Sequence, residues 1–299
     1  MIEVNHLSYS YGDHVALNDL SMRVPEGALY ALLGPNGSGK TTLLQILMGL
    51  RKARDGKVRV MGMDVGALSV TDRSQIAYIA EGQPLPRWMR LEQLEAFLAP
   101  LYPTWDKALA AELRQQFELH SHRKIGELSR GEHMKAALLA ALAPRPKLLI
   151  MDEPFTGMDA LVKDELVRGL LQSSGSEGWT VLLCSHDIGE LELLADSVGL
   201  IDRGQLRMSL TMDEVRSRFH HVDVTLAPGA TAPVHSHWLA SEQAGARISF
   251  VIEGDAAKEY AHLQQQLPGA RIEMRSASLR EVFIALTRKH TARSARVAA

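Results

Sequence analysis

The stretch that decides the fold is ALYALLGPNGSGKTTLLQILMGL, residues 28–50. Its apolar start predicts a buried strand over 28–33, and the leucine and isoleucine spacing over 42–50 predicts a helix. Between these elements, residues 34–41 match the pattern G-x-x-x-x-G-K-[ST]. A glycine-rich turn in this position directs backbone N–H groups and the positive end of a helix toward a phosphate group. The stretch therefore predicts an α/β fold with a phosphate-binding loop.

Individual residues of this loop have different predicted tasks. Lys40 supplies a mobile charge for the β- and γ-phosphates of a nucleotide, and Thr41 offers a hydroxyl to Mg²⁺. The alternative, a glycine-rich turn with no ligand, stays open until further residues are considered. The predicted nucleotide-binding residues of the loop are Gly34, Pro35, Asn36, Gly37, Ser38, Gly39, Lys40, Thr41 and Thr42.

A second apolar run, over 147–151, predicts a buried strand that ends in Asp152 and Glu153. Neighbouring residues on a strand point to opposite sides, so we expect the two carboxylates to have different tasks. Asp152 suits the Mg²⁺ shell, and Glu153 suits a general base that acts on the attacking water. A third predicted strand, over 180–184, leads to His186. Ligands of open α/β sheets lie beyond the carboxyl ends of the strands, where all these residues are expected.

Composition narrows the class of protein. The chain has 299 residues, of which 46% are hydrophobic and 23% charged, with one cysteine and a net charge of -2. These values exclude collagen, a disulfide-stapled scaffold and a mostly disordered chain, and they provide no global attraction for nucleic acid. We find no secretory signal and no apolar run of about 18 residues, so we expect a soluble cytoplasmic chain. Cys184 lies in an apolar run and is expected to be a small buried hydrophobe.

The rest of the chain suggests two domains. Residues 1–218 carry the α/β pattern, with an antiparallel β flank near the N-terminus and an inserted helical subdomain over about 86–128. Residues 219–290 predict a small α+β domain. Its last helix starts with the capping-box residues Ser278 and Glu281. Residues 291–299 lack apolar periodicity and are expected to form a disordered tail.

Further residues resemble one family. Residues 128–132, LSRGE, resemble the LSGGQ signature of ABC-type ATPases and precede the acidic strand, as in that family. The resemblance covers roughly residues 1–215 and implies an ABC-type P-loop ATPase core. The other matches are Gly157-Met158-Asp159 for the D-loop, His186 for the switch histidine, Tyr11 for the aromatic residue that stacks on adenine, and Glu81 for the Q-loop glutamine. For Tyr11, ordinary strand packing is the alternative.

The resemblance implies a mechanism. Two copies pair head to tail around ATP and Mg²⁺, so that the signature residues Ser129, Arg130, Gly131 and Glu132 of one copy meet the nucleotide of the other. It further implies that Glu153 and His186 are catalytic, that Glu81 and Asp159 couple the sites, and that Thr41, Asp152 and Glu81 hold the metal. Arg130, Glu132 and Glu81 depart from the family pattern, which puts the rate and the coupling in doubt more than the binding.

The implied partner is a separate integral membrane permease, with this chain on the cytoplasmic face of the inner membrane and no contact with nucleic acid. Residues 278–283, SLREVF, and 101–106, LYPTWD, resemble segments of ABC-2-type exporter ATPases, which implies export. Two alternatives stay open. One is a soluble ABC-type ATPase that acts on DNA or ribosomes, although too few residues separate Gly34 from Ser129 for the long coiled coil of the DNA-acting relatives. The other is a regulatory ATPase with weak hydrolysis.

Overall fold

A computed structural model describes residues 1–158, 162–163, 166, 178–186, 188–227, 235 and 237–297. The chain forms two compact units. The first contains Met1–Asp187 and Leu194–Met208, and the second contains Ile188–Leu193 and Ser209–Ala299. This division falls about ten residues before the boundary that we expected at residue 218. Within the described part of the chain, no helix has both the length and the apolarity needed to cross a bilayer.

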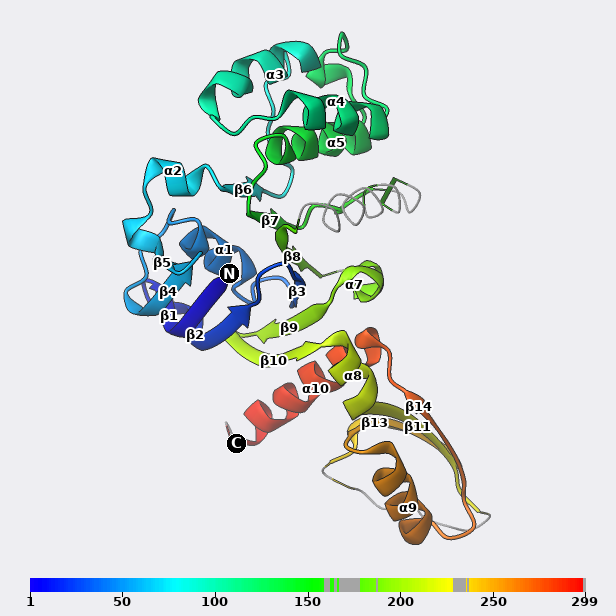
Figure 1. Ribbon diagram of the computed structural model, residues 1–299. Helices are drawn as coiled ribbons and strands as arrows, with labels where there is room; N and C mark the ends of the chain where they lie inside the picture. Colours follow the sequence, from blue (N-terminus) through cyan, green and yellow to red (C-terminus); the bar gives the residue numbers. More distant parts are fainter. Residues whose placement is uncertain are drawn as a thin grey trace. The chain divides into compact units, whose positions relative to one another are not determined.

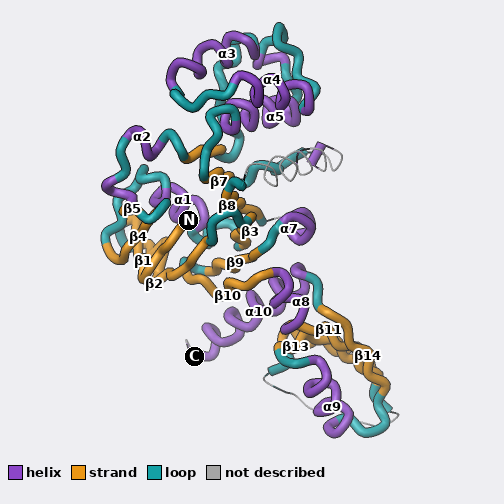
Figure 2. Tube along the Cα trace, viewed as in Figure 1, coloured by secondary structure: helices purple, strands orange, loops and turns teal. Residues whose placement is uncertain are grey.

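A six-stranded sheet forms the centre of the first unit (Figure 2). Its order is β10-β9-β3-β8-β7-β6, and β9, β3, β8, β7 and β6 run parallel. Every residue of β3, β7 and β8 is buried, as the continuous apolar runs predicted. The strands are β3 (Leu29–Leu33), β6 (Ile76–Ile79), β7 (Leu148–Asp152), β8 (Thr180–Ser185), β9 (Ser197–Asp202) and β10 (Gln205–Thr211).

The register of this sheet decides where the functional residues lie. Leu33 at the end of β3 pairs with Ser185 at the end of β8, and Cys184 pairs with Asp152 at the end of β7. The carboxyl ends of the three strands therefore meet at one edge. Helix α1 (Lys40–Leu47) begins at this edge, directly after the glycine-rich loop.

The predicted antiparallel flank is present as a four-stranded sheet of order β2-β1-β4-β5. Its strands are β1 (Ile2–Tyr11), β2 (His14–Val24), β4 (Asp55–Val60) and β5 (Met63–Asp64), followed by the 3-10 turn η1 (Val65–Ala67) and α2 (Val70–Arg73). Side chains of this flank, of α1 and of the central sheet share one apolar core. The core includes Ile2, Val4 and Leu7 of β1, the strand that ends at Tyr11.

Helices α3 (Leu91–Leu98), α4 (Lys107–Gln116) and α5 (Arg130–Leu142) group together, with the 3-10 turns η2 (Ala99–Leu101) and η3 (Ile125–Glu127) among them (Figure 1). The helices predicted over 91–98 and 108–117 are therefore confirmed. Met89, Leu94 and Ile125 form a small apolar cluster, against which Ala140 of α5 packs. Because α5 packs into this cluster, the helical region extends past the limit that we expected at residue 128.

The second unit contains a four-stranded sheet of order β12-β13-β11-β14, and its three neighbouring pairs β12–β13, β11–β13 and β11–β14 are antiparallel. The strands are β11 (Phe219–Thr225), β12 (Leu239–Ala244), β13 (Arg247–Glu253) and β14 (Arg271–Ser276). The helices are α7 (Ile188–Leu194), α8 (Met212–Arg218), α9 (Ala256–Gln266) and α10 (Leu279–Val297). Leu263 and Leu267 pack α9 onto the apolar face of this sheet.

Helix α10 differs from the expectation at its end. The capping box at its start is present, since Ser278 and Glu281 exchange hydrogen bonds with each other's backbone N–H. The helix then continues to Val297, whereas we expected a disordered tail from residue 291. Helix propagation needs only local backbone hydrogen bonds, so the end of an apolar stripe does not by itself end a helix.

Candidate active site

The glycine-rich loop has the curled backbone that its sequence predicts. Gly37 and Gly39 adopt φ values of 77° and 106°, in the region that favours glycine. A side chain at Gly39 would also lie 2.5 Å from the carbonyl oxygen of Ala16. Gly39 is the N-cap of α1, and it provides no side-chain hydrogen bond there, nor does the first turn carry an acidic residue. The backbone N–H groups at the start of α1 therefore have no side-chain partner. They form the positive end of the helix, which suits an anion.

Lys40 lies inside this loop with its ammonium group pointing back into the turn. Its Nζ donates to the carbonyl oxygen of Gly34 at 2.7 Å and lies 3.5 Å from Glu153 Oε1. Only 6% of Lys40 is exposed. The buried ammonium group thus donates to the carbonyl oxygens of Gly34 and Pro35 and faces one carboxylate, inside a loop that suits a phosphate.

Glu153 joins three parts of the site. Its Oε2 lies 2.8 Å from Nδ1 of His186 and its Oε1 faces Lys40, so the predicted residues Glu153 and His186 are brought together. Glu153 follows β7 in a left-handed conformation with φ 49°, and its N–H donates to the carbonyl oxygen of Cys184 at 2.9 Å. Strained non-glycine backbone of this kind persists only where surrounding contacts fix it, and it clusters at functional sites.

This turn corrects one detail of the expectation. Asp152 and Glu153 do not alternate along a strand, because β7 ends at Asp152 and the turn redirects Glu153 toward the glycine-rich loop. Both carboxylates therefore serve the same region, although with different partners. Glu153 faces Lys40 and His186, whereas Asp152 faces Thr41.

Asp152 and Thr41 form the other half of the site. The Thr41 hydroxyl donates to Asp152 Oδ2 at 2.8 Å. Burial raises the pKa of Asp152, and the negative charge of Glu153 raises it further, against the effect of the Thr41 hydrogen bond. Oδ1 of Asp152 and Oγ of Ser38 are buried without a hydrogen-bond partner among the described residues. Such buried polar atoms are costly unless a ligand pairs with them.

These oxygens fit a magnesium ion in one specific way. No cluster of three His, Cys, Asp or Glu side chains suited to a metal occurs in the part of the chain that the structure describes. Mg²⁺ in nucleotide sites, however, is held by one or two protein oxygens together with substrate phosphates and water. The free Asp152 oxygen beside the Thr41 hydroxyl meets that requirement, so these two residues are chemically suited to hold the metal.

A cavity of about 210 Å³ lies over the loop. Tyr11, Glu81 and Glu153 line it together with loop residues. Tyr11 is 40% exposed, and its hydroxyl lies 3.3 Å from Oγ1 of Thr42. Glu81, which the resemblance matched to the Q-loop glutamine, thus lies at the loop cavity. Gln83 lines different cavities, and its side chain accepts a hydrogen bond from the N–H of Ala80.

The signature residues lie elsewhere. Ser129 is the N-cap of α5, its Oγ accepts from the N–H of Glu132 at 3.2 Å, and Oε2 of Glu132 accepts from the N–H of Ser129 at 2.8 Å. Glu132 also pairs with Arg123, and hydrogen bonds from Ser129 hold its pKa below the usual range. The glutamate that departs from the family pattern thus completes a capping box.

The other two signature residues contact neighbouring elements. Arg130 lies beside the loop after β7, with Nη1 at 3.5 Å from the carbonyl oxygen of Gly157. A side chain at Gly131 would lie 2.4 Å from Cγ1 of Val162. Asp159, the predicted D-loop aspartate, lies outside the described residues.

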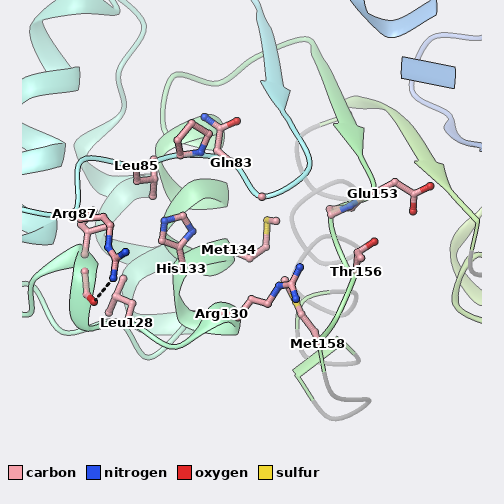
Figure 3. Close-up of a pocket in the computed structure, with 15 residues that line it drawn as sticks. Gln83, Leu85, Arg87, Leu128, Arg130, His133, Met134, Glu153, Thr156 and Met158 are labelled. Atoms are coloured by element: carbon pink, nitrogen blue, oxygen red, sulfur yellow. Dashed lines mark hydrogen bonds between the residues drawn. The ribbon is translucent and has the colours of Figure 1, made fainter. Parts of the chain in front are cut away.

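A second cavity, of about 390 Å³, lies beside the signature segment, and Leu128, Arg130 and Glu153 are among its lining residues (Figure 3). Its walls include Arg87, Arg130 and His133 on one side and Thr156 and Met158 on the other. Burial lowers the pKa of His133, and Arg87 lowers it further. In Figure 3 the side chain of Glu153 points away from the helical residues, toward the other cavity. Among described residues, only Glu153 lines both cavities, and none of 128–132 lines the loop cavity.

Two contributors were missed by sequence reasoning. Arg123 pairs with Glu132, and Arg51 places its guanidinium over the Tyr11 ring. Neither arginine lies in a motif, and no sequence pattern predicts which side chain an isolated arginine will contact. Cys184 was described correctly as a buried residue, and burial raises the pKa of its thiol well above the usual range. Its carbonyl oxygen nevertheless anchors Glu153.

Known protein families give a direct match to this architecture. The family model for the ABC transporter matches residues 17–156. The chain is 36% identical over 226 residues to the sulfate/thiosulfate import ATP-binding protein CysA 1 of Chromobacterium violaceum, covering 73% of this chain and 63% of that protein. It is 26% identical to the ABC transporter ATP-binding protein YtrB of Bacillus subtilis, covering 95% of this chain and 97% of that protein.

Solved structures agree with the fold. The structure of an ATP-binding subunit of an ABC transporter is similar with a TM-score of 0.65 and 29% identity, covering 72% of this chain and 92% of that chain. A dimeric ATP-binding cassette bound to ADP and phosphate has a TM-score of 0.62 at 23% identity, which supports the fold alone.

The chain spans less than two thirds of the length of the import proteins that it resembles. Their names give no support to the exporter that we expected from residues 101–106 and 278–283. The ordered motifs, the parallel sheet with its loop and acidic strand end, and these matches agree on one assignment. The chain contains an ABC transporter ATP-binding domain.

Proposed function

We propose that this chain binds Mg·ATP in the cavity over the glycine-rich loop and hydrolyses it as the ATP-binding subunit of a membrane transporter. The observation that carries the proposal is the position of the Glu153 carboxylate, which lies between Lys40 and His186 at the end of β7. A carboxylate held there, next to a phosphate-binding loop, is placed to act on a water molecule that attacks the γ-phosphate.

Each residue of the site has its own proposed role in the hydrolysis of ATP. N–H groups of the loop and of the start of α1, together with Lys40, bind and orient the phosphates. Mg²⁺, held by Thr41 and Asp152 with help from Glu81, neutralises charge on the β- and γ-phosphates when bound. Glu153 accepts a proton from a water molecule while the oxygen of that water bonds to the γ-phosphorus. The bond between the γ-phosphorus and the bridging oxygen breaks at the same time, and that oxygen leaves with ADP. His186, hydrogen-bonded to Glu153, positions that carboxylate and contacts the γ-phosphate.

A second copy of the chain is the proposed partner for this reaction. In one chain, the signature residues line no part of the loop cavity, so their expected contact with a γ-phosphate needs another molecule. The proposed arrangement is a head-to-tail dimer in which Ser129 and Gly131 of one copy meet the nucleotide of the other. Asp159 would then couple the two sites, although it lies outside the described residues.

A membrane permease is the proposed partner for transport, with this chain on the cytoplasmic face of the membrane. The support is the naming of similar proteins as ATP-binding proteins of transporters. We assign no direction, because the likeness of two short segments to exporter subunits stands against the import proteins among the relatives. A weakly active regulatory subunit is not favoured, since Glu132 is explained by its capping box.

The substitution Glu153→Gln tests the proposal. It keeps the size and the hydrogen bond to His186 but removes the basic oxygen, so we expect ATP binding to persist while hydrolysis falls by roughly 100-fold to 10,000-fold. Size-exclusion chromatography with light scattering should then detect an ATP-dependent dimer of the variant. Glu26→Gln, at an exposed position, is the matched control. Hydrolysis by Glu153→Gln at the unmodified rate would contradict the role given to this residue.

A further inference from the structure

The ring of Tyr11 is fixed from several sides. The guanidinium carbon of Arg51 lies 4.7 Å from the ring centroid, over one face of the ring. Tyr9 packs edge-on at a centroid distance of 5.1 Å, and the Tyr11 hydroxyl lies 3.3 Å from Oγ1 of Thr42. A phenol ring in contact with Arg51 and Tyr9, and with Thr42 at its hydroxyl, has little freedom to turn.

Arg51 is itself held in place. Its Nε donates to Oε1 of Gln45 at 2.5 Å, and its Nη1 donates to the hydroxyl of Tyr9 at 3.4 Å. Gln45 and Thr42 both belong to α1, the helix that starts at the glycine-rich loop. The ring of Tyr11 is therefore tied to α1 twice, once through Thr42 and once through Arg51 and Gln45.

This arrangement has a consequence for nucleotide binding. Tyr11 lines the same cavity as the loop residues 36–42, so the ring and the phosphate site are neighbours. A cation over one face of an aromatic ring attracts it and leaves the opposite face for a flat ligand. Since α1 carries both the phosphate-binding end and Gln45, which anchors Arg51, the same helix holds the phosphate site and one of the contacts that fix the ring.

We propose that Arg51 is a positioning residue for the nucleotide base: it backs the Tyr11 ring, so that the other face of the ring stacks on the base while α1 binds the phosphates. The inference rests on the proposed function, because it needs a nucleotide in this cavity. It makes base binding dependent on a residue outside every nucleotide motif. Arg51 touches no phosphate in this arrangement, so its effect must depend on the base.

The experiment compares two ligands that share a diphosphate, ADP and inorganic pyrophosphate, each with Mg²⁺, by calorimetry or by competition against labelled ADP. Arg51→Ala should weaken ADP binding by about 3-fold to 10-fold and leave pyrophosphate binding unchanged, as expected for the loss of one cation–aromatic contact. In a Tyr11→Ala background, Arg51→Ala should have no further effect on ADP. Arg59→Ala, an exposed arginine on the neighbouring strand β4, is the matched control.

Each other result overturns the inference. Unchanged ADP binding by Arg51→Ala would remove the role, and an equal loss for ADP and pyrophosphate would assign Arg51 to the phosphates or to folding. Tighter ADP binding would mean that Arg51 occupies the face that the base needs. If the unmodified chain binds neither ligand, the proposed function fails and this inference with it, whereas the other outcomes leave the proposed function intact. Thermal unfolding midpoints confirm that all variants are folded.

Discussion

The loop cavity and the signature segment, residues 128–132, satisfy their polar atoms in opposite ways. At the loop cavity, Oγ of the lining residue Ser38 and Oδ1 of Asp152, which bonds to the lining residue Thr41, are buried without a hydrogen-bond partner among described residues. In the signature segment, Ser129 and Glu132 bond to each other's backbone, and Glu132 also pairs with Arg123. The first region is incomplete without a ligand, whereas the second is complete as a helix start.

This difference fits the two kinds of binding residue that the proposed dimer requires. The loop cavity has high-energy polar atoms that a ligand can satisfy, so its affinity is built into the single chain. The signature segment uses its side chains to fix the first turn of α5, which leaves a rigid helix end that a ligand carried by another molecule can approach.

The second unit contains a copy of the signature arrangement without a nucleotide motif. Ser278 caps α10, Glu281 returns a hydrogen bond, and Arg275 pairs with Glu281 through two bonds at 2.9 and 2.5 Å. The same three residue types, Ser129, Glu132 and Arg123, occur at α5. This parallel supports a structural explanation of Glu132, in which the glutamate stabilises a helix start and is not required for chemistry.

The largest expected effect is at the loop cavity. Lys40→Ala removes the cation that faces the phosphates and leaves Glu153 buried without its ammonium partner. We expect ATP hydrolysis to fall by roughly 100-fold or more, with a comparable loss of ATP binding in calorimetry. Lys52→Ala, at an exposed position, should behave like the unmodified chain. ATP binding by Lys40→Ala within a few-fold of normal would show that the cavity is not the phosphate site.

A second prediction separates stability from function in the same cavity. Burial raises the pKa of Asp152, so its charged form costs stability above that raised pKa, and the cost disappears as falling pH protonates the folded carboxyl. Asp152→Asn should therefore raise the free energy of unfolding without ligand, by about 1 kcal/mol near neutral pH, while Mg·ATP hydrolysis is lost. Denaturant unfolding at pH 8 and near pH 4, close to the ordinary value of 3.8 for this carboxyl, measures the gain, which should be smaller near pH 4. A gain that grew toward low pH would refute the assignment.

In the signature segment, we expect the hydrogen bonds of the helix cap at Glu132 to affect stability, and we expect the charge of Glu132 to have little effect on hydrolysis. Glu132→Ala removes the returning hydrogen bond and the Arg123 pair, so we expect a loss of about 1 kcal/mol in the free energy of unfolding. Glu132→Gln keeps an acceptor for the cap, so its free energy of unfolding should fall by only a few tenths of 1 kcal/mol. Its ATP hydrolysis should stay within a few-fold of normal. If the glutamine variant instead hydrolysed ATP many times faster, the charge of Glu132 would act on the reaction.

The smallest expected effect on hydrolysis is in the second unit. The Arg275 hydrogen bonds lower the pKa of Glu281 to about 2, from an ordinary value of 4.5. Its charge therefore stabilises the fold above pH 4.5, and this contribution is lost as the pH falls toward 2. Glu281→Gln should lower the free energy of unfolding by about 1 kcal/mol at pH 7, with little difference near pH 2 and unchanged hydrolysis. Circular dichroism across this range checks it, and a deficit independent of pH would contradict the charge explanation.

Much of the first unit was predictable because its signals are local. The runs at 28–33, 147–151 and 180–184 are apolar throughout, and each strand lies within a residue of its prediction. Glycine at position 39 indicates a backbone conformation with positive φ, which other residues rarely adopt. In the structure Gly39 has a φ of 106°. Boundaries that depend on packing were predicted less accurately. Helix α8 belongs to the second unit, although we expected the first domain to extend to residue 218, and α10 continues past residue 290.

The sequence by itself determined the elements and the chemical types of the loop cavity, because strand runs, glycines and motif residues act through the local backbone. Only the tertiary structure decided which atoms face each other: the left-handed turn that brings Glu153 to Lys40, the Arg51 guanidinium over Tyr11, and the Arg123 pair of Glu132. These contacts join residues from separate elements, and their geometry follows from strand register and core packing, which no short stretch of sequence encodes.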